Sequence, residues 1–387
     1  MIQLFKSDKR ITLIDYLAVF LLIISCGTAY FYLYNAGSTL LILLFFSFFY
    51  AIKKNVKFKV NCFTVIYVLL ILVNYLLFGY DMNLVGDLIF LISTFLIVSS
   101  SIFTVFRRAF FDVTVILAIV SIFFEILFLS NIISPVLYGD GKGGLFGHYL
   151  YCYHAFGGGL WGINSQLYGI FWEPGIYQMV LNIALLMNMD SLDKMSKIPS
   201  KRIKILVLVL AIILTRSTTG YLTLGIILVG FFIRKSAKSP KSKILAILSL
   251  IVFGIVVVSS SVITDKFSDN NASFIARSND WIALTNAIIA HPLWGSGVNA
   301  AAFDKVAVKF GMHGSKSAGI LFQTAQMGLF WLFAYYYSLR KEFRKRNLQI
   351  SIVFYIIAIT FLGIGEPLMY SPLMLLLVLP FKKYQYE

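Results

Sequence analysis

The sequence predicts an all-α, polytopic membrane protein, and three observations support this fold class. The first is composition: 59% of the 387 residues are hydrophobic and 13% are charged, whereas soluble domains carry about 25% charged residues. The second is a series of about twelve apolar segments of membrane-spanning length. The third is the position of Lys and Arg between those segments, which follows the positive-inside rule. A soluble globular protein is therefore excluded.

The apolar segments define the helices that we expect to cross the bilayer. A hydrocarbon core about 30 Å thick requires about 20 residues of helix. The first segment follows a polar N-terminal stretch and is of full length, so we expect an uncleaved helix and not a signal peptide. The expected spans are 11–34, 37–52, 60–80, 84–106, 109–131, 175–189, 203–215, 219–233, 244–263, 317–338, 350–364 and 369–381.

The net charge of +16 is explained by topology. With both termini inside, 26 of the 33 Lys and Arg fall in expected cytoplasmic segments. No nucleic-acid partner is needed to account for the basic excess. The remaining basic residues fall in external connections: Lys142, Arg216, Lys266, Arg277, Lys305, Lys309 and Lys316.

Two external connections are much longer than the others, within what we expect to be a single transmembrane domain over residues 1–387. Loop 132–174 is rich in glycine and aromatic residues. Its rings could stack on sugars or form an aromatic belt at the interface. Its His148 and His154 have no acidic or Cys cluster nearby, so no metal site is expected there.

The second long loop, 265–316, has a helical pattern in its middle. Trp281, Leu284 and Ile288 recur at helical spacing before His291 and Pro292. We expect an amphipathic helix lying on the outer interface.

Basic residues of this second loop suggest an anion site. With Arg277, they would give a positively charged vestibule suited to a diphosphate, although the loop's aspartates could simply balance them. His313 could act as a general base or could be an ordinary surface histidine. The basic and histidine residues after Arg277 are Lys305, Lys309, His313 and Lys316, and the aspartates are Asp265, Asp269, Asp280 and Asp304.

Separate arguments place three charged residues at the outer mouth of the bundle. Arg216 lies in the turn between two short spans, and Glu366 lies in the tip of the last hairpin. Glu173 stands directly before a proline that starts a helix. Arg216 could instead extend to the lipid head groups, and Glu173 could merely stabilise the helix N-terminus. The convergence of all three at one end favours a functional site.

Several short motifs together resemble a known family. In order, spacing and outer placement they are similar to the Wzy-type polymerases of O-antigen and capsule repeat units, which share a superfamily with the O-antigen ligases. The resemblance covers roughly residues 170–370. The motifs are Phe171-Trp172-Glu173-Pro174-Gly175, Leu214-Thr215-Arg216-Ser217-Thr218-Thr219-Gly220, Arg277 with His291-Pro292-Leu293-Trp294-Gly295-Ser296-Gly297, and His313 with Gly328-Leu329.

The resemblance implies a type-C glycosyltransferase-like fold in the bacterial cytoplasmic membrane. The implied reaction transfers a growing glycan from undecaprenyl diphosphate to a hydroxyl of the incoming lipid-linked repeat, on the external face. Its partners would be the lipid-linked donor and acceptor, membrane lipid, and, as candidates, a chain-length regulator and a flippase. No cofactor and no metal are implied.

The resemblance also implies roles for individual residues. Arg216, Arg277 and Lys316 would bind the donor diphosphate, and His313 would be the base for the acceptor hydroxyl. Glu173 would organise the site or serve as the alternative base. Supporting positions would be Glu366, Ser217 and Trp172.

Two classes of alternative remain. Within the superfamily, composition does not separate a polymerase from a ligase. A transporter or lipid-linked oligosaccharide flippase is the alternative of another class. The basic run at 53–59 is unlike a carrier motif, and a transporter has no need of a fifty-residue external loop. A shape-and-division peptidoglycan polymerase is less favoured, since that family's motifs are not found.

Overall fold

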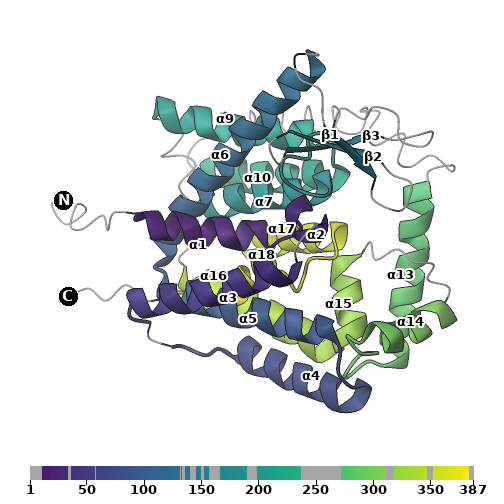
Figure 1. Cartoon of the computed structure of the whole chain (residues 1–387). Helices are drawn as coiled ribbons and strands as arrows, with labels where there is room; N and C mark the ends of the chain where they lie inside the picture. The colour runs from purple at the N-terminus through teal and green to yellow at the C-terminus, as the bar shows by residue number, and fades with distance from the viewer. Residues whose placement is uncertain are drawn as a thin grey trace.

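The computed structural model describes twelve stretches of the chain. These are residues 11–33, 36–56, 58–130, 132, 136–139, 145–149, 152–156, 166–189, 198–236, 272–310, 318–346 and 352–382. Within them the chain is mainly α-helical (Figure 1). The helices are α1 (Leu13–Ile24), α2 (Ala29–Leu33), α3 (Ala36–Lys53), α4 (Cys62–Phe78), α5 (Met82–Ser100), α6 (Phe103–Leu129), α7 (Pro174–Asn188), α9 (Pro199–Leu214), α10 (Thr218–Ser236), α13 (Ala272–Ala290), α14 (Ala300–Lys309), α15 (Gly319–Met327), α16 (Leu329–Lys345), α17 (Ile352–Gly365) and α18 (Pro372–Val378).

Most of these helices form one bundle, while α13 crosses its edge. Figure 1 shows α1, α3 and α5 running side by side, and α3 packs against both α1 and α5. Likewise α10 packs against α17 and α7. The green helix α13 stands steeply to them at the right of the view and packs on α15 and α14.

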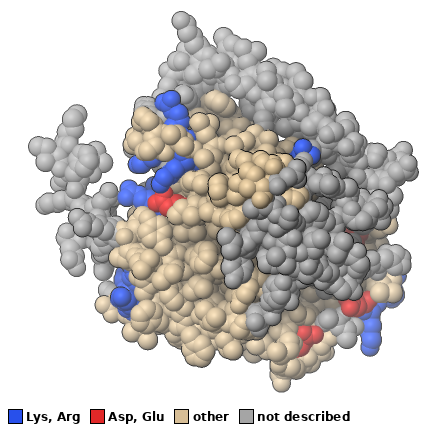
Figure 2. All heavy atoms as spheres, turned by 45° about the horizontal axis from the view of Figure 1, so that its top comes forward, with Lys and Arg blue, Asp and Glu red and all other residues tan. Residues whose placement is uncertain are grey.

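Apolar side chains cover much of the outside of the bundle. Among the described residues, three helices are long and apolar enough to cross a membrane: α3, α5 and α6. Shorter apolar helices are α1, α4, α17 and the part of α10 up to Ile233. In the face drawn in Figure 2, charged atoms of described residues gather mainly at the left edge and lower right, with a broad uncharged area between. The apolar helices are consistent with an integral membrane protein.

Local signals in the sequence explain where several helices begin. Asn61 accepts a hydrogen bond from the Thr64 N–H (3.0 Å) at the start of α4, and Asp81 accepts one from the Asn83 N–H (2.7 Å) at the start of α5. Both are typical N-cap residues. Helices α7, α9 and α18 each carry proline at the first position, where its missing N–H costs nothing.

One end of the bundle gathers the segments that the charge pattern assigns to the cytoplasm, and we call it the inner end. The Lys382 ammonium donates to the carbonyl of Lys54 (3.0 Å), after α3. The Lys382 backbone N–H donates to the carbonyl of Ser101 (3.0 Å), between α5 and α6. Lys204 of α9 pairs with Asp112 of α6 (2.6 Å). Basic residues of the inner end therefore also bind backbone carbonyls and carboxylates.

The first expected span, 11–34, is not continuous. It divides into α1 and α2 at Gly27, which has a φ of +78°. The carbonyl of Gly27 accepts from the Trp172 N–H (3.2 Å), and the N–H of Ala29 donates to Ile170 (3.0 Å). The break thus receives the chain segment that leads into α7, and apolar composition on both sides concealed it.

The expected span 317–338 is also broken, into α15 and α16. Gly328 has a φ of +81°, and its Cα lies so close to Leu293 that no Cβ could fit. The Leu329 N–H donates to the carbonyl of Pro292 (2.7 Å). The turn after α13 therefore occupies the gap between the two helices.

Two other expected boundaries are corrected. The expected spans 84–106 and 109–131 meet at Ser101, where the serine hydroxyl bonds back to the Ile97 carbonyl (2.7 Å) and helix α5 ends. Arg107 and Arg108 consequently lie within α6 and not in a connecting loop.

The last expected span, 369–381, is helical only over α18. Leu379 precedes a proline and is extended, with φ −86° and ψ 148°, because proline disfavours the helical conformation of the residue before it. The expected span 244–263 lies outside the described residues. The number of spans is therefore not fixed at twelve.

The first long loop contains strands as well as turns. Strands β1 (Val136–Gly139), β2 (Leu145–Tyr149) and β3 (Cys152–Phe156) form an antiparallel sheet in the order β1-β2-β3. Register pairs Tyr138 with Phe146 and Gly147 with His154. The expected all-α class thus needs the addition of this small sheet.

Candidate active site at the outer end of the bundle

The turn between α9 and α10 holds Arg216 in an unusual backbone conformation. Arg216 has a φ of +49°, the left-handed region that costs residues with a Cβ roughly 1–2 kcal/mol. Its side chain is exposed, whereas Thr215 and Ser217 on either side are buried. The backbone around it is fixed, because the Leu214 carbonyl accepts from Leu167 N–H (2.9 Å). Backbone strain of this kind is enriched at functional sites.

Ser217 has a local structural task. Its hydroxyl accepts from the Gly220 N–H (3.4 Å) and its carbonyl accepts from the Tyr221 N–H (3.0 Å), as at a helix N-cap. The Tyr221 hydroxyl then donates to the Ile213 carbonyl (2.8 Å), which ties α10 to α9. Ser217 and Tyr221 therefore hold the turn that presents Arg216.

Glu366 lies against the N-terminus of α7. Its side chain is 5% exposed, and a Cβ placed on Gly175 would overlap the Glu366 carboxylate. Gly175 is the second residue of α7, where backbone N–H groups have no partner within the helix and a negative charge is stabilised. The glycine in Glu173-Pro174-Gly175 is thus explained by close contact with a distant carboxylate.

Glu173 is exposed and forms no side-chain hydrogen bond to the helix that it precedes. Glu173 is the N-cap residue of α7 by its backbone position, and the Glu366 carboxylate also lies at this helix end. Burial raises the pKa of nearby Tyr168 to about 12, and the negative charges of Glu173 and Glu125 add to that shift. Tyr168 is thus a neutral hydroxyl within electrostatic reach of Glu173.

The turns that carry these residues meet. A Cβ on Gly365 would lie 2.7 Å from Cγ2 of Thr219, so the end of α17 touches the start of α10. A Cβ on Gly319 would lie 2.6 Å from the carbonyl oxygen of Gly363, so the start of α15 touches the same tip. The structure therefore brings together the beginnings of α7, α10 and α15 and the end of α17, and we call this the outer end.

The turn Trp294-Gly295-Ser296-Gly297 serves to fasten α13 to the bundle. The Ser296 N–H donates to Ala325 (2.7 Å), and the Val298 N–H donates to the side chain of Asn74 in α4 (2.9 Å). Gly297 has a φ of +98° and packs on the ring of Phe78. The glycines in this motif are therefore required for docking.

Helix α13 is amphipathic, but not with every residue that the pattern suggested. Leu284, Ala283 and Ala287 are buried on the face toward α15, and Asp280 is buried with them. Trp281 is 43% exposed and lies off that face. The exposed indole is available to an interface or ligand.

Sequence reasoning missed a row of buried polar groups below the outer end. On α7, Gln178 and Asn182 follow Gly175 at helical spacing, and Asn182 Nδ2 donates to Gln178 Oε1 (2.9 Å). Within the described residues, Gln178 Nε2 and Thr223 Oγ1 have no hydrogen-bond partner, and neither does the amide of Gln323 on α15. Such groups are places where water or a polar ligand binds. The i, i+4 spacing of two amides in an apolar helix was the available signal.

Three of the expected site residues cannot be placed fully. His313 and Lys316 lie outside the described residues, and so does the side chain of Arg277, although its backbone belongs to α13. Lys316 precedes Gly319 by three positions in the sequence. Trp172 is half-buried, and its N–H anchors it to Gly27.

Comparison with known proteins gives one result. Residues 203–321 match the Wzy_C family model, described as O-antigen ligase. No curated protein and no solved structure matches the chain. The matched segment includes Arg216, Arg277, His313 and Lys316, and it contains the α9–α10 turn and α13. Residues 203–321 of this chain are therefore similar to the Wzy_C family, described as O-antigen ligase.

Proposed function

We propose that this protein polymerises undecaprenyl-diphosphate-linked oligosaccharide repeats into O-antigen or capsular polysaccharide on the external face of the cytoplasmic membrane. The observation that carries the proposal is the outer end. There the strained Arg216 turn, inside the matched segment, meets Glu366 and the start of α7, both outside it. Both chain termini would lie in the cytoplasm.

The proposed reaction exchanges one bond at the donor sugar. The acceptor hydroxyl oxygen forms a bond to the anomeric carbon as the bond from that carbon to the diphosphate oxygen breaks. His313 accepts the hydroxyl proton, with Glu173 as the alternative base. The leaving diphosphate gains negative charge, and Arg216, Arg277 and Lys316 stabilise it.

Supporting roles follow from the contacts at the outer end. Ser217 caps α10 and so keeps the Arg216 turn in place. The Glu366 carboxylate packs against Gly175 at the start of α7, and the Trp172 backbone N–H binds the Gly27 carbonyl, which holds the segment before α7 in place. These residues position the site without a need to touch the reacting atoms.

A ligase that moves finished polymer from the lipid carrier to lipid A core is the second candidate, favoured by the description of the matched family. Deleting the gene and analysing the surface glycan separates the candidates. A single repeat without polymer supports the polymerase, whereas polymer retained on the lipid carrier supports the ligase. Loss of all surface glycan with repeats accumulating inside would indicate a flippase and contradict both enzyme proposals.

Residue variants test the assigned roles in the same assay. We expect Arg216→Ala and Arg277→Ala each to leave single-repeat glycolipid without polymer at a normal protein level. Wild-type chain-length ladders in both variants would overturn the diphosphate assignment. His313→Gln is expected to remove polymer as well, and a full ladder would move the base to Glu173.

A further inference from the structure

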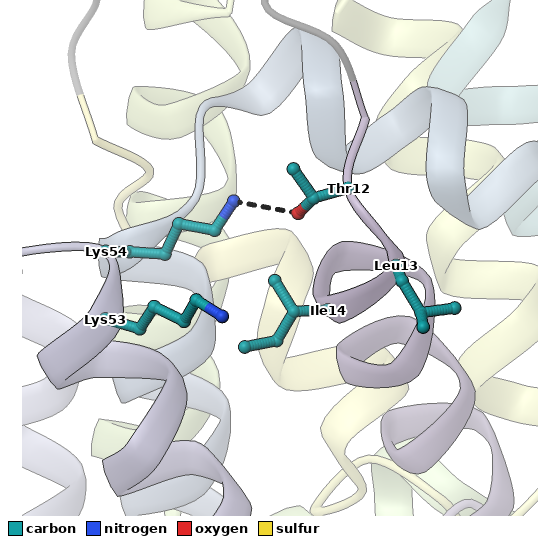
Figure 3. Close-up of a pocket in the computed structure, with 5 residues that line it drawn as sticks. All are labelled: Thr12, Leu13, Ile14, Lys53 and Lys54. Atoms are coloured by element: carbon teal, nitrogen blue, oxygen red, sulfur yellow. Dashed lines mark hydrogen bonds between the residues drawn. The ribbon is translucent and has the colours of Figure 1, made fainter.

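A second polar site lies at the inner end, far along the chain from every residue assigned above. A pocket of about 330 Å³ is lined by Thr12, Leu13, Ile14, Lys53 and Lys54, where the start of α1 faces the end of α3 (Figure 3). This volume is at the lower end of the range for ligand sites, ~300–1,000 Å³. Figure 3 shows both lysine side chains extending from α3 toward the start of α1.

The charge facing the pocket is positive. Asp15, the residue after Ile14 of the lining, is 4% exposed and already engaged. It accepts from the Tyr50 hydroxyl (2.7 Å) and pairs with the Lys54 ammonium (2.8 Å). Lys53 is exposed, and its Nζ lies 5.8 Å from the centre of the Phe49 ring. Lys53 therefore contributes a charge that Asp15, bound by Lys54, does not neutralise.

The two helices that carry the pocket also expose apolar side chains. Leu13 is 76% exposed and Ile52 is 75% exposed, and Phe49 and Leu17 are exposed on the same two helices. Helix α3 is about 27 Å long at 1.5 Å per residue and ends at Lys53, so the lysines stand where a membrane-spanning helix leaves the hydrocarbon. A ligand here would meet ammonium groups at one end and apolar side chains at the other.

We propose that this pocket binds the phosphate head group of an anionic glycerophospholipid, with Lys53 as the principal cationic contact and the acyl chains along α1 and α3. Basic pockets between transmembrane helices on the cytoplasmic side commonly bind acidic lipid head groups. Thr12 and Lys54 also line the pocket, and the Lys54 ammonium donates to the Thr12 hydroxyl (3.4 Å). The proposal concerns lipid binding and does not depend on the glycan reaction.

Lys53→Gln and Lys341→Gln form a matched pair for the test. Lys341 is also an exposed lysine near the inner end of its helix, α16, and its Nζ also lies 5.8 Å from a ring centre, that of Tyr337. It does not line the pocket. Both changes remove one surface charge and leave the Lys54–Asp15 pair intact.

The experiment uses the full-length protein in phosphatidylcholine nanodiscs, with and without phosphatidylglycerol, and counts bound lipid by native mass spectrometry. We expect Lys53→Gln to weaken phosphatidylglycerol binding roughly fivefold, since one lysine near the surface contributes about 1 kcal/mol. Lys341→Gln should bind as the wild type does. Equal binding by both variants, or equal loss in both, would refute a specific pocket. Thermal unfolding of the same nanodiscs separates a lipid from free phosphate, and we expect phosphatidylglycerol to raise the unfolding temperature. If inorganic phosphate added to pure phosphatidylcholine nanodiscs raises the unfolding temperature as much as phosphatidylglycerol does, the site binds free phosphate and the lipid assignment is wrong.

Discussion

The carboxylate of Glu366, in the turn after α17, lies directly on Gly175 at the start of α7. The two residues are about 190 positions apart in the sequence, and their contact depends on the absence of a Cβ at Gly175. A carboxylate at this position is stabilised by the unpaired N–H groups of the first helical turn. The contact joins the segment that carries Glu173 to the tip of the last helical hairpin.

Replacing Gly175 with alanine should displace the Glu366 carboxylate. The new Cβ would lie 2.6 Å from Glu366 Cδ, and overpacking of this kind costs about 1–3 kcal/mol. We expect a lower thermal unfolding temperature for the purified protein and shorter or absent polymer in the chain-length ladder.

Gly86→Ala is the control for this change. Gly86 lies inside α5 and has no atom within 4 Å of the position of a new Cβ. Alanine there should be neutral or should stabilise the protein by up to about 1 kcal/mol through helix propensity. If Gly175→Ala behaves like Gly86→Ala in both assays, the contact with Glu366 has no importance for the site.

The positive φ of Arg216 allows the effect of its backbone strain on stability to be separated from the effect of its guanidinium on polymer formation. Glycine adopts a positive φ without the Cβ penalty, so Arg216→Gly should relieve about 1 kcal/mol of strain while removing the guanidinium. We expect normal or raised thermal stability together with loss of polymer.

Asn55 provides the matched control, because it is the other described non-glycine residue with a positive φ, +47°. Asn55→Gly should leave the chain-length ladder unchanged. Loss of polymer in Asn55→Gly, or its retention in Arg216→Gly, would show that the arginine side chain is not the functional element of the turn.

Hydropathy and charge predicted much of the site region, for physical reasons. The cost of charge in a hydrocarbon confines charged residues to helix ends, and the structure places Arg216 in the turn between α9 and α10 and Glu366 in the turn after α17. The contact of Glu366 with Gly175 is a tertiary packing event, and no local pattern encodes it. The breaks at Gly27 and Gly328 were also missed, because both lie in apolar sequence and each is fixed by a distant segment.

The sidedness of the molecule can be tested with its own cysteines. Cys62 is exposed at the first position of α4, beside Asn61, whose side chain donates to the Val378 carbonyl (2.6 Å) of the inner end. Cys152 stands in the first long loop, which the charge pattern places outside. A membrane-impermeant thiol reagent should label the Cys62→Ala protein in intact spheroplasts. The Cys152→Ala protein should be labelled only after lysis, and the reverse pattern would invert the topology.

Two ion pairs of the inner end differ mainly in burial, and their removal should have unequal effects. Lys54 and Asp15 have side chains 27% and 5% exposed, against 41% and 27% for Lys204 and Asp112. Loss of Lys54 would leave a buried carboxylate with only hydroxyl and backbone donors. The loss in free energy of unfolding should therefore exceed the ~1 kcal/mol typical of an exposed pair, while partial exposure of Lys54 keeps it below the ~3–5 kcal/mol of a fully buried pair.

We expect Lys54→Ala to lower the unfolding temperature in detergent clearly more than Lys204→Ala does. Asp15→Asn combined with Lys54→Ala should recover part of the loss, since the uncompensated charge is then gone. Equal effects of the two lysine changes would mean that burial of Asp15 does not govern stability at the inner end.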